Sequence, residues 1–372
     1  MGVEITDPET LRERMTAWLP GMLAVEGVPV DDLRVEPVTR PKTGQSNETV
    51  FVTASWTRAG VPAGASFVAR LQPRANQMFL DADVVREGNL ISRLASDTTI
   101  AVPPIRAVVS DPDILGVPFF IMDRIEGHVP SGRPSIHVDP WLQALTDAQR
   151  RTLVVNALDG LCEVHAVQPS VVSDVLEVSP GSTTIESAVG HLRRWYDWAR
   201  RGRAFPLLDH ALDVLEGEAP EGSAPVLLWG DPRLGNMIFD DQLRVAAVLD
   251  WEIASVGPAE LDLGWWLMMD EFARRGAGER VLPGFLSRQE TIDHYRSVSG
   301  RQPVDLPFSE LLAAVKLAVT LIPAMDSLIA RSILRPDTRF ADENVPTQIV
   351  ADLLGEPEPQ VCADYRRLSG MS

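Results

Sequence analysis

The sequence predicts an α+β protein with a small strand-rich region followed by a larger helical region. Strand-like segments are concentrated in the first third of the 372 residues, and helical patterns dominate the remainder. Segregation of strands from helices along the chain is typical of the α+β class. We expect the boundary near residue 125, which gives domains over 1–124 and 125–372.

Composition places the chain among globular proteins, because 45% of its residues are apolar and 23% are charged. No uninterrupted apolar run reaches the roughly eighteen residues that a membrane span needs. The acidic, polar amino terminus does not resemble a signal peptide, so a cytoplasmic protein without a membrane partner is expected. A formal charge of -18 without a basic stripe argues against nucleic acid as a partner. Monomer and homodimer both stay open.

The first third predicts one helix, several strands and a second helix. Residues 8–25 have a helical pattern that Pro20 is expected to interrupt. The turn-forming stretch RAGVPAG at 58–64 separates two strand-like segments and predicts a hairpin. The expected elements are strands at 33–38, 48–56, 65–72, 105–111 and 117–125, and a helix at 81–95.

Past residue 125, apolar residues recur at helical spacing over long stretches. The expected helices span 147–167, 184–202, 204–217, 259–275, 288–299 and 309–333. Cys162 falls inside the first of these helices and is expected to be a small buried side chain.

The stretch LLWGDPRLGNMIFDDQLRVAAVLDWE (227–252) carries three oxygen-bearing side chains at the ends of apolar runs. The polar connection at 240–242 predicts a hairpin. An antiparallel return would bring Asp250 beside the loop that holds Asp231 and Asn236. Two carboxylates and an amide oxygen suit Mg²⁺, and phosphoryl transfer needs such a metal together with a carboxylate that orients the attacking hydroxyl. Asp and Asn are also common loop residues, so the spacing alone has an ordinary explanation.

The spacing D-x-x-x-x-N, followed by an Asp after a hairpin, is that of a kinase catalytic loop and metal loop. With WGDPRLGN, VLDWE and GPAELDLGWW, the chain resembles the aminoglycoside phosphotransferase-like family of small-molecule kinases, which is related to choline kinases, and most of all its bacterial phosphotransferase branch. The resemblance covers nearly the whole chain. It implies a bilobal protein-kinase-like fold and an ATP- and Mg²⁺-dependent O-phosphotransferase.

Position by position, the resemblance implies Asp231 as the catalytic base and Asn236 and Asp250 as metal ligands. Asp262 matches the acid that braces the catalytic loop, although an acid in a first helical turn is also favoured by the helix dipole. The family's usual His two positions before the base is Trp229 here.

In the first domain, the resemblance implies a nucleotide-binding lobe. TGQSNETVFV (43–52) resembles the loop that covers the phosphates, and FFIMDRIEG (119–127) matches the hinge whose backbone would read the adenine edge. Arg70 replaces the strand lysine, and Glu87 matches the helix acid that pairs with it, with an ordinary surface carboxylate as the alternative. The implied nucleotide-binding residues are Gly44, Ser46, Asn47, Thr49, Arg70, Glu87, Met122, Asp123 and Arg124.

The acceptor is expected to be a hydroxylated small molecule of unspecified class. A polyamine sugar such as an aminoglycoside could bind Asp270, Glu271 and Asp326. The apolar helix at 309–333 instead suggests a lipid-like or CoA-linked molecule. ATP is the expected phosphoryl donor, with GTP left open.

The departures at Arg70 and Trp229 motivate an alternative, a kinase-like module that binds nucleotide or another ligand without turnover. His165 matches a recurring family position but is expected to be a structural histidine. The tryptophans at 195, 198, 265 and 266 are expected in the helical core.

Overall fold

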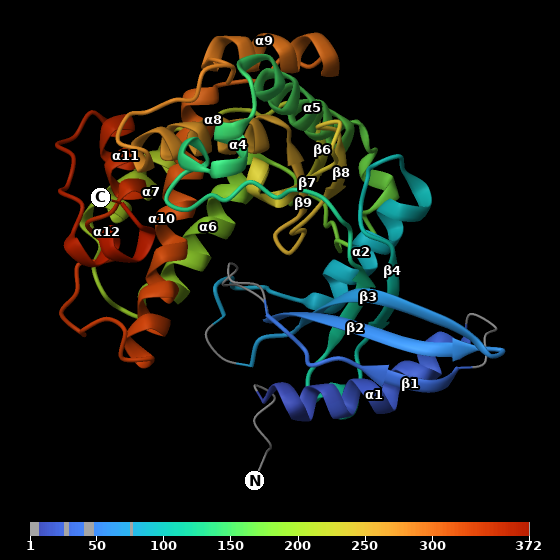
Figure 1. Ribbon diagram of the computed structural model, residues 1–372. Coiled ribbons are helices and arrows are strands. Elements are labelled where there is room, and N and C mark those ends of the chain that lie inside the picture. Colours follow the sequence, from blue (N-terminus) through green and yellow to red (C-terminus); the bar gives the residue numbers. More distant parts are fainter. Residues whose placement is uncertain (1–6, 26–29, 41–47, 75–76, 372) are drawn as a thin grey trace. The chain divides into compact units, whose positions relative to one another are not determined.

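The computed structural model describes residues 7–25, 30–40, 48–74 and 77–371. The chain divides into two compact units (Figure 1). Unit 1 comprises Met1–Gln77, Asp81–Asp97 and Val102–Ile125, and unit 2 comprises Met78–Leu80, Thr98–Ala101 and Glu126–Ser372. Strands dominate the first and helices the second, so the expected α+β class is confirmed.

Unit 1 is built on a five-stranded antiparallel sheet with the strand order β1-β2-β3-β5-β4. Its elements are α1 (Pro8–Val25), β1 (Asp31–Val35), β2 (Glu48–Arg58), β3 (Val61–Leu71), α2 (Val84–Asp97), β4 (Ile105–Val109), α3 (Pro112–Leu115) and β5 (Phe119–Asp123). Helix α2 packs against β4 and β5.

Helix α1 runs through Pro20 without a break, so the expected interruption was wrong. Its side chains Leu11, Met15, Leu19 and Leu23 form a buried stripe at four-residue spacing, within one apolar core that includes sheet residues. Each such burial contributes about 1.5–3 kcal/mol. Together they outweigh the cost of about 3 kcal/mol that a proline imposes on a helix interior.

The hairpin between β2 and β3 has a shorter turn than the sequence suggested. Arg58 pairs with Val61, so only Ala59 and Gly60 form the connection. Their φ values are +49° and +79°. Two positive φ angles in a two-residue loop match the right-handed twist of the flanking strands, which lets both strands extend to eleven residues.

Unit 2 is mainly helical. Its helices are α4 (Pro140–Ala144), α5 (Asp147–Ala166), α6 (Ile185–Arg200), α7 (Pro206–Gly217), α8 (Glu260–Gly276), α9 (Arg288–Ser299), α10 (Leu306–Ala330), α11 (Val345–Leu354) and α12 (Ala363–Ser369). Short 3₁₀ turns lie at Ile136–Val138, Pro169–Val171 and Leu234–Asn236. The strands β6 (Pro225–Leu228) and β9 (Ser255–Pro258) form one antiparallel pair, and β7 (Met237–Phe239) and β8 (Val245–Val248) form another.

Helix α10 is the core helix of unit 2. It packs against α8, α11, α6 and α7. It is long and apolar enough to cross a membrane, and it is the one such helix in the part of the chain that the structure describes. Yet 56% of its most apolar 18-residue window is buried inside the protein, as expected for a core helix. Lys316 breaks its apolar sequence, and the side chain of this lysine is part of the site described next.

Candidate active site

The β7–β8 hairpin brings together two polar residues that the sequence separates. Met237 pairs with Val248, and beyond this pair the Leu249 amide donates to the Asn236 carbonyl at 2.9 Å. Asp250 therefore follows directly after a residue bonded to Asn236. Its φ of +65° is a left-handed conformation that costs free energy in a non-glycine residue and is concentrated at functional sites.

The carboxylate of Asp231 is held in one orientation by neutral donors. The Asn236 amide nitrogen donates to Asp231 Oδ2 at 2.7 Å and to the Asp231 carbonyl at 3.1 Å. The indole Nε1 of Trp265, on α8, donates to Oδ1 at 2.8 Å. Because the nitrogen of the Asn236 amide is bonded to Asp231, its oxygen is the atom left for a cation.

Arg233 adds a charged donor to the same carboxylate. Its Nε lies 3.0 and 2.9 Å from the two Asp231 oxygens. Burial would lower the pKa of this guanidinium, but the nearby charges of Asp231, Asp250 and Glu252 raise it above its usual value. Three acids thus surround one arginine, whose side chain is about one-third exposed. Sequence reasoning missed this residue, although its position two after Asp231 could have drawn attention to it.

Asp262 holds the loop that precedes Asp231, at the position that the resemblance implied. Its carboxylate accepts from the Trp229 amide at 2.7 Å and from the Gly230 amide at 3.0 Å. His165 is fully buried between Asp262 and Tyr295, with its ring nitrogens 3.2 Å from the carboxylate and 2.7 Å from the phenol oxygen. His165 is thus a buried histidine with a partner at each ring nitrogen, as the sequence predicted for a structural residue.

Trp229 links the loop of Asp231 to the loop of Asp250. It is fully buried, and its Nε1 donates to the Leu249 carbonyl at 2.8 Å, one residue before Asp250. The next residue must be glycine, because a Cβ on Gly230 would lie 2.4 Å from the Ile253 carbonyl oxygen and its φ is +91°. A tryptophan here therefore supplies a link between the loops of Asp231 and Asp250.

Lys316 reaches the loop from α10. Its ammonium donates to the Gly230 carbonyl at 2.8 Å and lies 4.7 Å from the centre of the Trp265 ring. Burial lowers its pKa, although Asp262 and Asp231 act in the opposite direction. A lysine inside an apolar helix was the available sequence signal, and sequence reasoning did not use it.

The donor chemistry fits Mg²⁺. Asp250 offers a carboxylate and Asn236 an amide oxygen, both of which are hard oxygen ligands. No group of three or more His, Cys, Asp or Glu residues that could hold a metal occurs among the described residues. Such a protein-only cage is unnecessary, since Mg²⁺ usually takes one or two carboxylates and completes its shell with water and substrate phosphates.

In unit 1 the structure brings Arg70, Glu87 and Thr49 together. Arg70 Nη2 lies 3.2 Å from Glu87 Oε1, and its Nη1 lies 3.4 Å from Thr49 Oγ1 on the neighbouring strand. Glu87 is only 3% exposed, so the alternative of a surface carboxylate is wrong. The expected residues Gly44, Ser46 and Asn47 lie outside the described residues.

The predicted hinge is partly occupied by bonds within unit 1. The amide of Asp123 donates to the Pro104 carbonyl at 2.9 Å, and the amide of Arg124 donates to the Ser66 carbonyl at 3.0 Å. The Asp123 carboxylate binds Arg106 through two contacts of 2.8 Å. Met122 pairs with strand residues on both sides of β5. The amide groups of Asp123 and Arg124 are thus already bonded within unit 1 and are not free to donate to an adenine ring.

The acids expected to hold a polyamine are neutralised within unit 2. Arg203 forms a two-pronged ion pair with Asp326, at 2.6 and 2.9 Å. Arg274 and Arg275 both bind Glu271, which lowers the pKa of this glutamate in spite of its burial. For Asp270, burial raises the pKa to about 7.

The expected core tryptophans divide into two kinds. Trp195 and Trp266 are buried, and Trp198 is partly buried against the same apolar core as Trp195. Trp265 is buried too, but its contact with Asp231 makes it part of the site.

Comparison with known proteins places this geometry in a family. The model of the phosphotransferase enzyme family, APH, matches residues 37–300. A protein of Ralstonia eutropha whose crystal structure is described as that of a putative aminoglycoside phosphotransferase is 21% identical and has a TM-score of 0.63, with 92% of this chain and 95% of that chain covered. The choline kinase LicA of Streptococcus pneumoniae is 11% identical with a TM-score of 0.51, covering 93% and 97%. These likenesses show a kinase-like fold.

Sequence relatives include acyl-CoA dehydrogenase family member 11 of Rattus norvegicus, which is 25% identical over 329 residues. The match covers 84% of this chain and 38% of the relative. The chain spans between about a fifth and two-fifths of the length of the acyl-CoA dehydrogenase relatives it matches. The family match covers well over half of the residues and includes the loop around Asp231, so the chain belongs to the phosphotransferase enzyme family and is a small-molecule kinase.

Proposed function

We propose that the protein transfers a phosphoryl group from ATP to a hydroxyl of a small-molecule acceptor, with Asp231 as the general base. The observation that carries this proposal is the fixed orientation of the Asp231 carboxylate by Asn236, Trp265 and Arg233. A carboxylate has about four lone-pair sites and three N–H donors point at this one, so about one site is left to accept a hydrogen bond from an incoming hydroxyl. Alignment of that hydroxyl and removal of its proton are then the work of Asp231.

Asp250 and the amide oxygen of Asn236 would hold Mg²⁺, which when bound neutralises charge on the nucleotide phosphates. Arg70 is proposed to neutralise further phosphate charge. Its guanidinium is always ionised, and Glu87 fixes its position through the 3.2 Å ion pair. Arg233, beside Asp231, is proposed to stabilise negative charge that develops on the transferred group. Catalysis would then consist of positioning and electrostatics, with little covalent work by the protein.

For the acceptor, we propose a hydroxylated acyl-CoA-like molecule rather than a polyamine. The relatives with matching segments are named as acyl-CoA dehydrogenases, and this chain corresponds to between about a fifth and two-fifths of their length. A polycationic acceptor would need free carboxylates, whereas Glu271 and Asp326 are bound to arginines. Both observations support an acceptor that is not a polycation.

The test is ADP release and mass detection of a phosphorylated product across a panel of hydroxylated acceptors, including hydroxyacyl-CoA thioesters. Asp231→Asn should lower kcat about 10²–10⁴-fold, the usual contribution of a general base. Stabilisation by Mg·ATP in a thermal shift should be retained. Asp240→Asn is the matched control, because Asp240 lies in the β7–β8 connection and binds only its near neighbours there. Unchanged turnover in Asp231→Asn would refute the assigned role.

The alternative of a binding module without turnover is distinguished by the same experiment. Its motivation is the pair of departures at Arg70 and Trp229, although Arg70 forms an ion pair with Glu87. Thermal stabilisation by nucleotide, together with no ADP release with any acceptor of the panel, would favour that alternative.

A further inference from the structure

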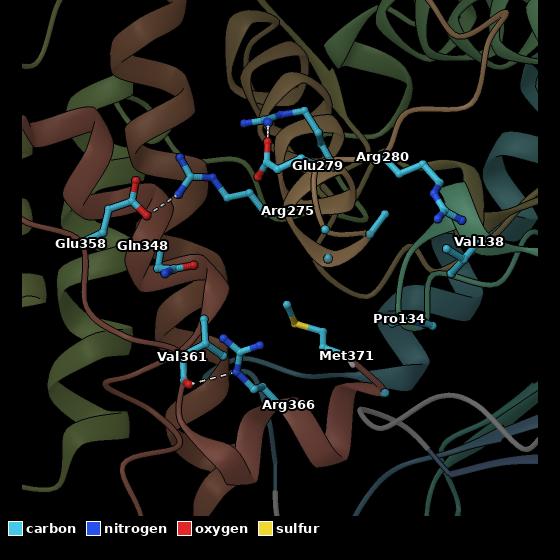
Figure 2. A pocket seen from close by; sticks show the side chains of 15 residues that line it. Pro134, Val138, Arg275, Glu279, Arg280, Gln348, Glu358, Val361, Arg366 and Met371 are labelled. Atoms are coloured by element: carbon cyan, nitrogen blue, oxygen red, sulfur yellow. Dashed lines mark hydrogen bonds and ion pairs between the residues drawn. The ribbon is translucent and has the colours of Figure 1, made fainter.

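Unit 2 contains a pocket of about 580 Å³ beyond the C-terminal end of α8 (Figure 2). Its walls come from the segment 134–138, from residues 274–280, and from α11, α12 and the chain that joins them. The charged residues that line it are Arg274, Arg275, Arg280, Arg366, Glu279 and Glu358. We call it the arginine pocket. Arginines outnumber acids there, although the whole chain carries a formal charge of -18.

Two of these arginines are already neutralised by acids. Arg275 lies 2.9 Å from Glu358 and 2.5 Å from Glu271. Arg274 binds Glu271 at 2.6 Å and also contacts Glu279. These ion pairs form one wall of the pocket and use up its lining carboxylates (Figure 2). The wall therefore offers no free negative charge to a cationic ligand.

The other two arginines have no carboxylate partner within the described ranges. Arg366 donates from Nε to the Val361 carbonyl at 3.3 Å, and Arg280 has neither a hydrogen bond nor an ion pair there. Figure 2 shows Arg280 reaching toward Val138, and Arg366 beside Val361 on the other side of the pocket. A guanidinium presents a planar fork of donors that matches phosphate and carboxylate oxygens in pairs. Two uncompensated forks on the lining of one pocket fit a ligand that carries more than one anionic group.

The backbone holds Arg280 over the end of α8. Gly278 and Glu279 have φ values of +64° and +68°, so two consecutive left-handed residues reverse the chain. The Glu279 amide donates to the Arg274 carbonyl at 2.9 Å, which closes this turn. A left-handed conformation is unfavourable for a glutamate. This unfavourable turn directly precedes Arg280 and sets where its side chain begins.

The segment 130–134 runs from the loop of Asp231 to the lining of the arginine pocket. A Cβ on Gly132 would lie 3.7 Å from Arg233 Nη1. Two residues later the same segment reaches Pro134, which lines the pocket. Ser135 Oγ donates to the Ala273 carbonyl at 2.6 Å, which fixes the segment to the end of α8. Two residues span at most about 7 Å, so an extended molecule could reach both places.

We propose that the arginine pocket binds anionic groups of the acceptor, phosphate or carboxylate, remote from the hydroxyl that Asp231 aligns, with Arg280 and Arg366 each contacting one of these groups. This assignment rests on the proposed function and specifies its acceptor as an anion. It gives the pocket a role in binding and none in the chemical step.

The test uses the full chain with Arg280→Gln, Arg366→Gln and the double variant. Arg335→Gln is the matched control, because Arg335 is highly exposed, pairs with Asp337 and does not line the pocket. Calorimetric titration with coenzyme A and with inorganic phosphate, at constant ionic strength, measures binding without turnover. The double variant should bind coenzyme A about 10–100-fold more weakly, since two charge-assisted contacts are lost. The control should bind it as the wild type does.

Kinetics connect the pocket to the acceptor. The double variant should raise KM for an anionic acceptor by a similar factor, with kcat and the KM for ATP changed less than about 2-fold. The KM for a neutral hydroxylated analogue should stay unchanged. Wild-type coenzyme A binding and wild-type KM in the double variant would overturn the proposal. Weaker phosphate binding with an unchanged acceptor KM would also overturn it and would identify a site for free anions. If no acceptor is turned over, the proposed function fails, and coenzyme A titration still decides whether the pocket binds an anion.

Discussion

At the scale of single residues, the site depends on side chains far from Asp231 in sequence. Asn236 and Arg233 belong to its own loop, whereas Trp265 comes from α8 and Lys316 from α10. Sequence motifs identify the first kind, since their spacing is local. Trp265 and Lys316 reach the site because the faces of α8 and α10 that carry them pack against the loop, and spacing along the sequence does not reveal this packing.

Lys316 is predicted to be a positioning residue. Lys316→Met removes the bond to the Gly230 carbonyl and the charge near Asp231, so kcat should fall about 10–100-fold. Lys316→Arg keeps a charged donor at this position and should restore most of the lost kcat. Steady-state kinetics measure both variants under conditions where thermal unfolding shows that they are folded. An equal loss of kcat in Lys316→Met and Lys316→Arg would contradict a role for the bond and the charge.

Asp270 is predicted to make stability depend on pH. Burial raises its pKa to about 7, above the usual 3.8. Between these values the folded state keeps a proton that the unfolded state has released, so stability falls as pH rises and levels off above about 7. Asp270→Asn should therefore gain about 1–3 kcal/mol at pH 8, below the full value of about 4 kcal/mol because the side chain is partly exposed. Urea titrations at pH 5 and pH 8 measure this, and an equal effect at both values would contradict it.

At the scale of elements, the first turn of α8 presents two buried acids with different partners. Asp262 accepts from the amides of Trp229 and Gly230, and Glu260 accepts from the amide and hydroxyl of Ser223. Both should stabilise the fold, because each replaces water at buried donors. Only Asp262 holds the loop that leads to Asp231. One helix therefore contains both a test residue and its control.

Asp262→Asn and Glu260→Gln should each lower the free energy of unfolding by about 2–4 kcal/mol, since one amide group would then face a buried donor. Under conditions where both variants are fully folded, Asp262→Asn should reduce kcat at least 10-fold, and Glu260→Gln should leave it nearly unchanged. Urea unfolding and steady-state kinetics measure the two effects. Equal losses of kcat would mean that the hydrogen bonds of Asp262 to the loop affect activity only through global stability.

Which elements the sequence could predict follows from how local their signals are. The β7–β8 hairpin and helix α5 were predicted because apolar runs, a polar turn and regular periodicity lie within the segments themselves. β9, with the sequence SVGP, has no such pattern and becomes a strand by pairing with β6. The predicted interruption at Pro20 was wrong because burial of one face of α1 outweighs the local helix-breaking effect of the proline.

At the scale of the whole molecule, the chain combines a strongly acidic surface with sites that are proposed to bind anions. The formal charge is -18, while ATP and the proposed acceptor are both negatively charged. Local arginines such as Arg70 and Arg280 would have to attract ligands that the protein as a whole repels. Repulsion by the net charge acts over a longer range than attraction by a local arginine, so a change in salt concentration distinguishes the two. Long-range repulsion between exposed charges is screened beyond about 10 Å at about 0.1 M salt, whereas contacts within a pocket are screened much less.

The association rate of coenzyme A should therefore rise with ionic strength. Between about 10 and 150 mM salt we expect kon to increase a few-fold, because screening removes the repulsion due to the net charge. Stopped-flow binding with the wild type and with the Arg280→Gln and Arg366→Gln double variant measures this. The variant should show a similar salt dependence of kon and a faster dissociation, since its loss is local. A kon that falls with salt in the wild type would show that a positive field around the arginine pocket, rather than the net charge, governs the approach of the ligand.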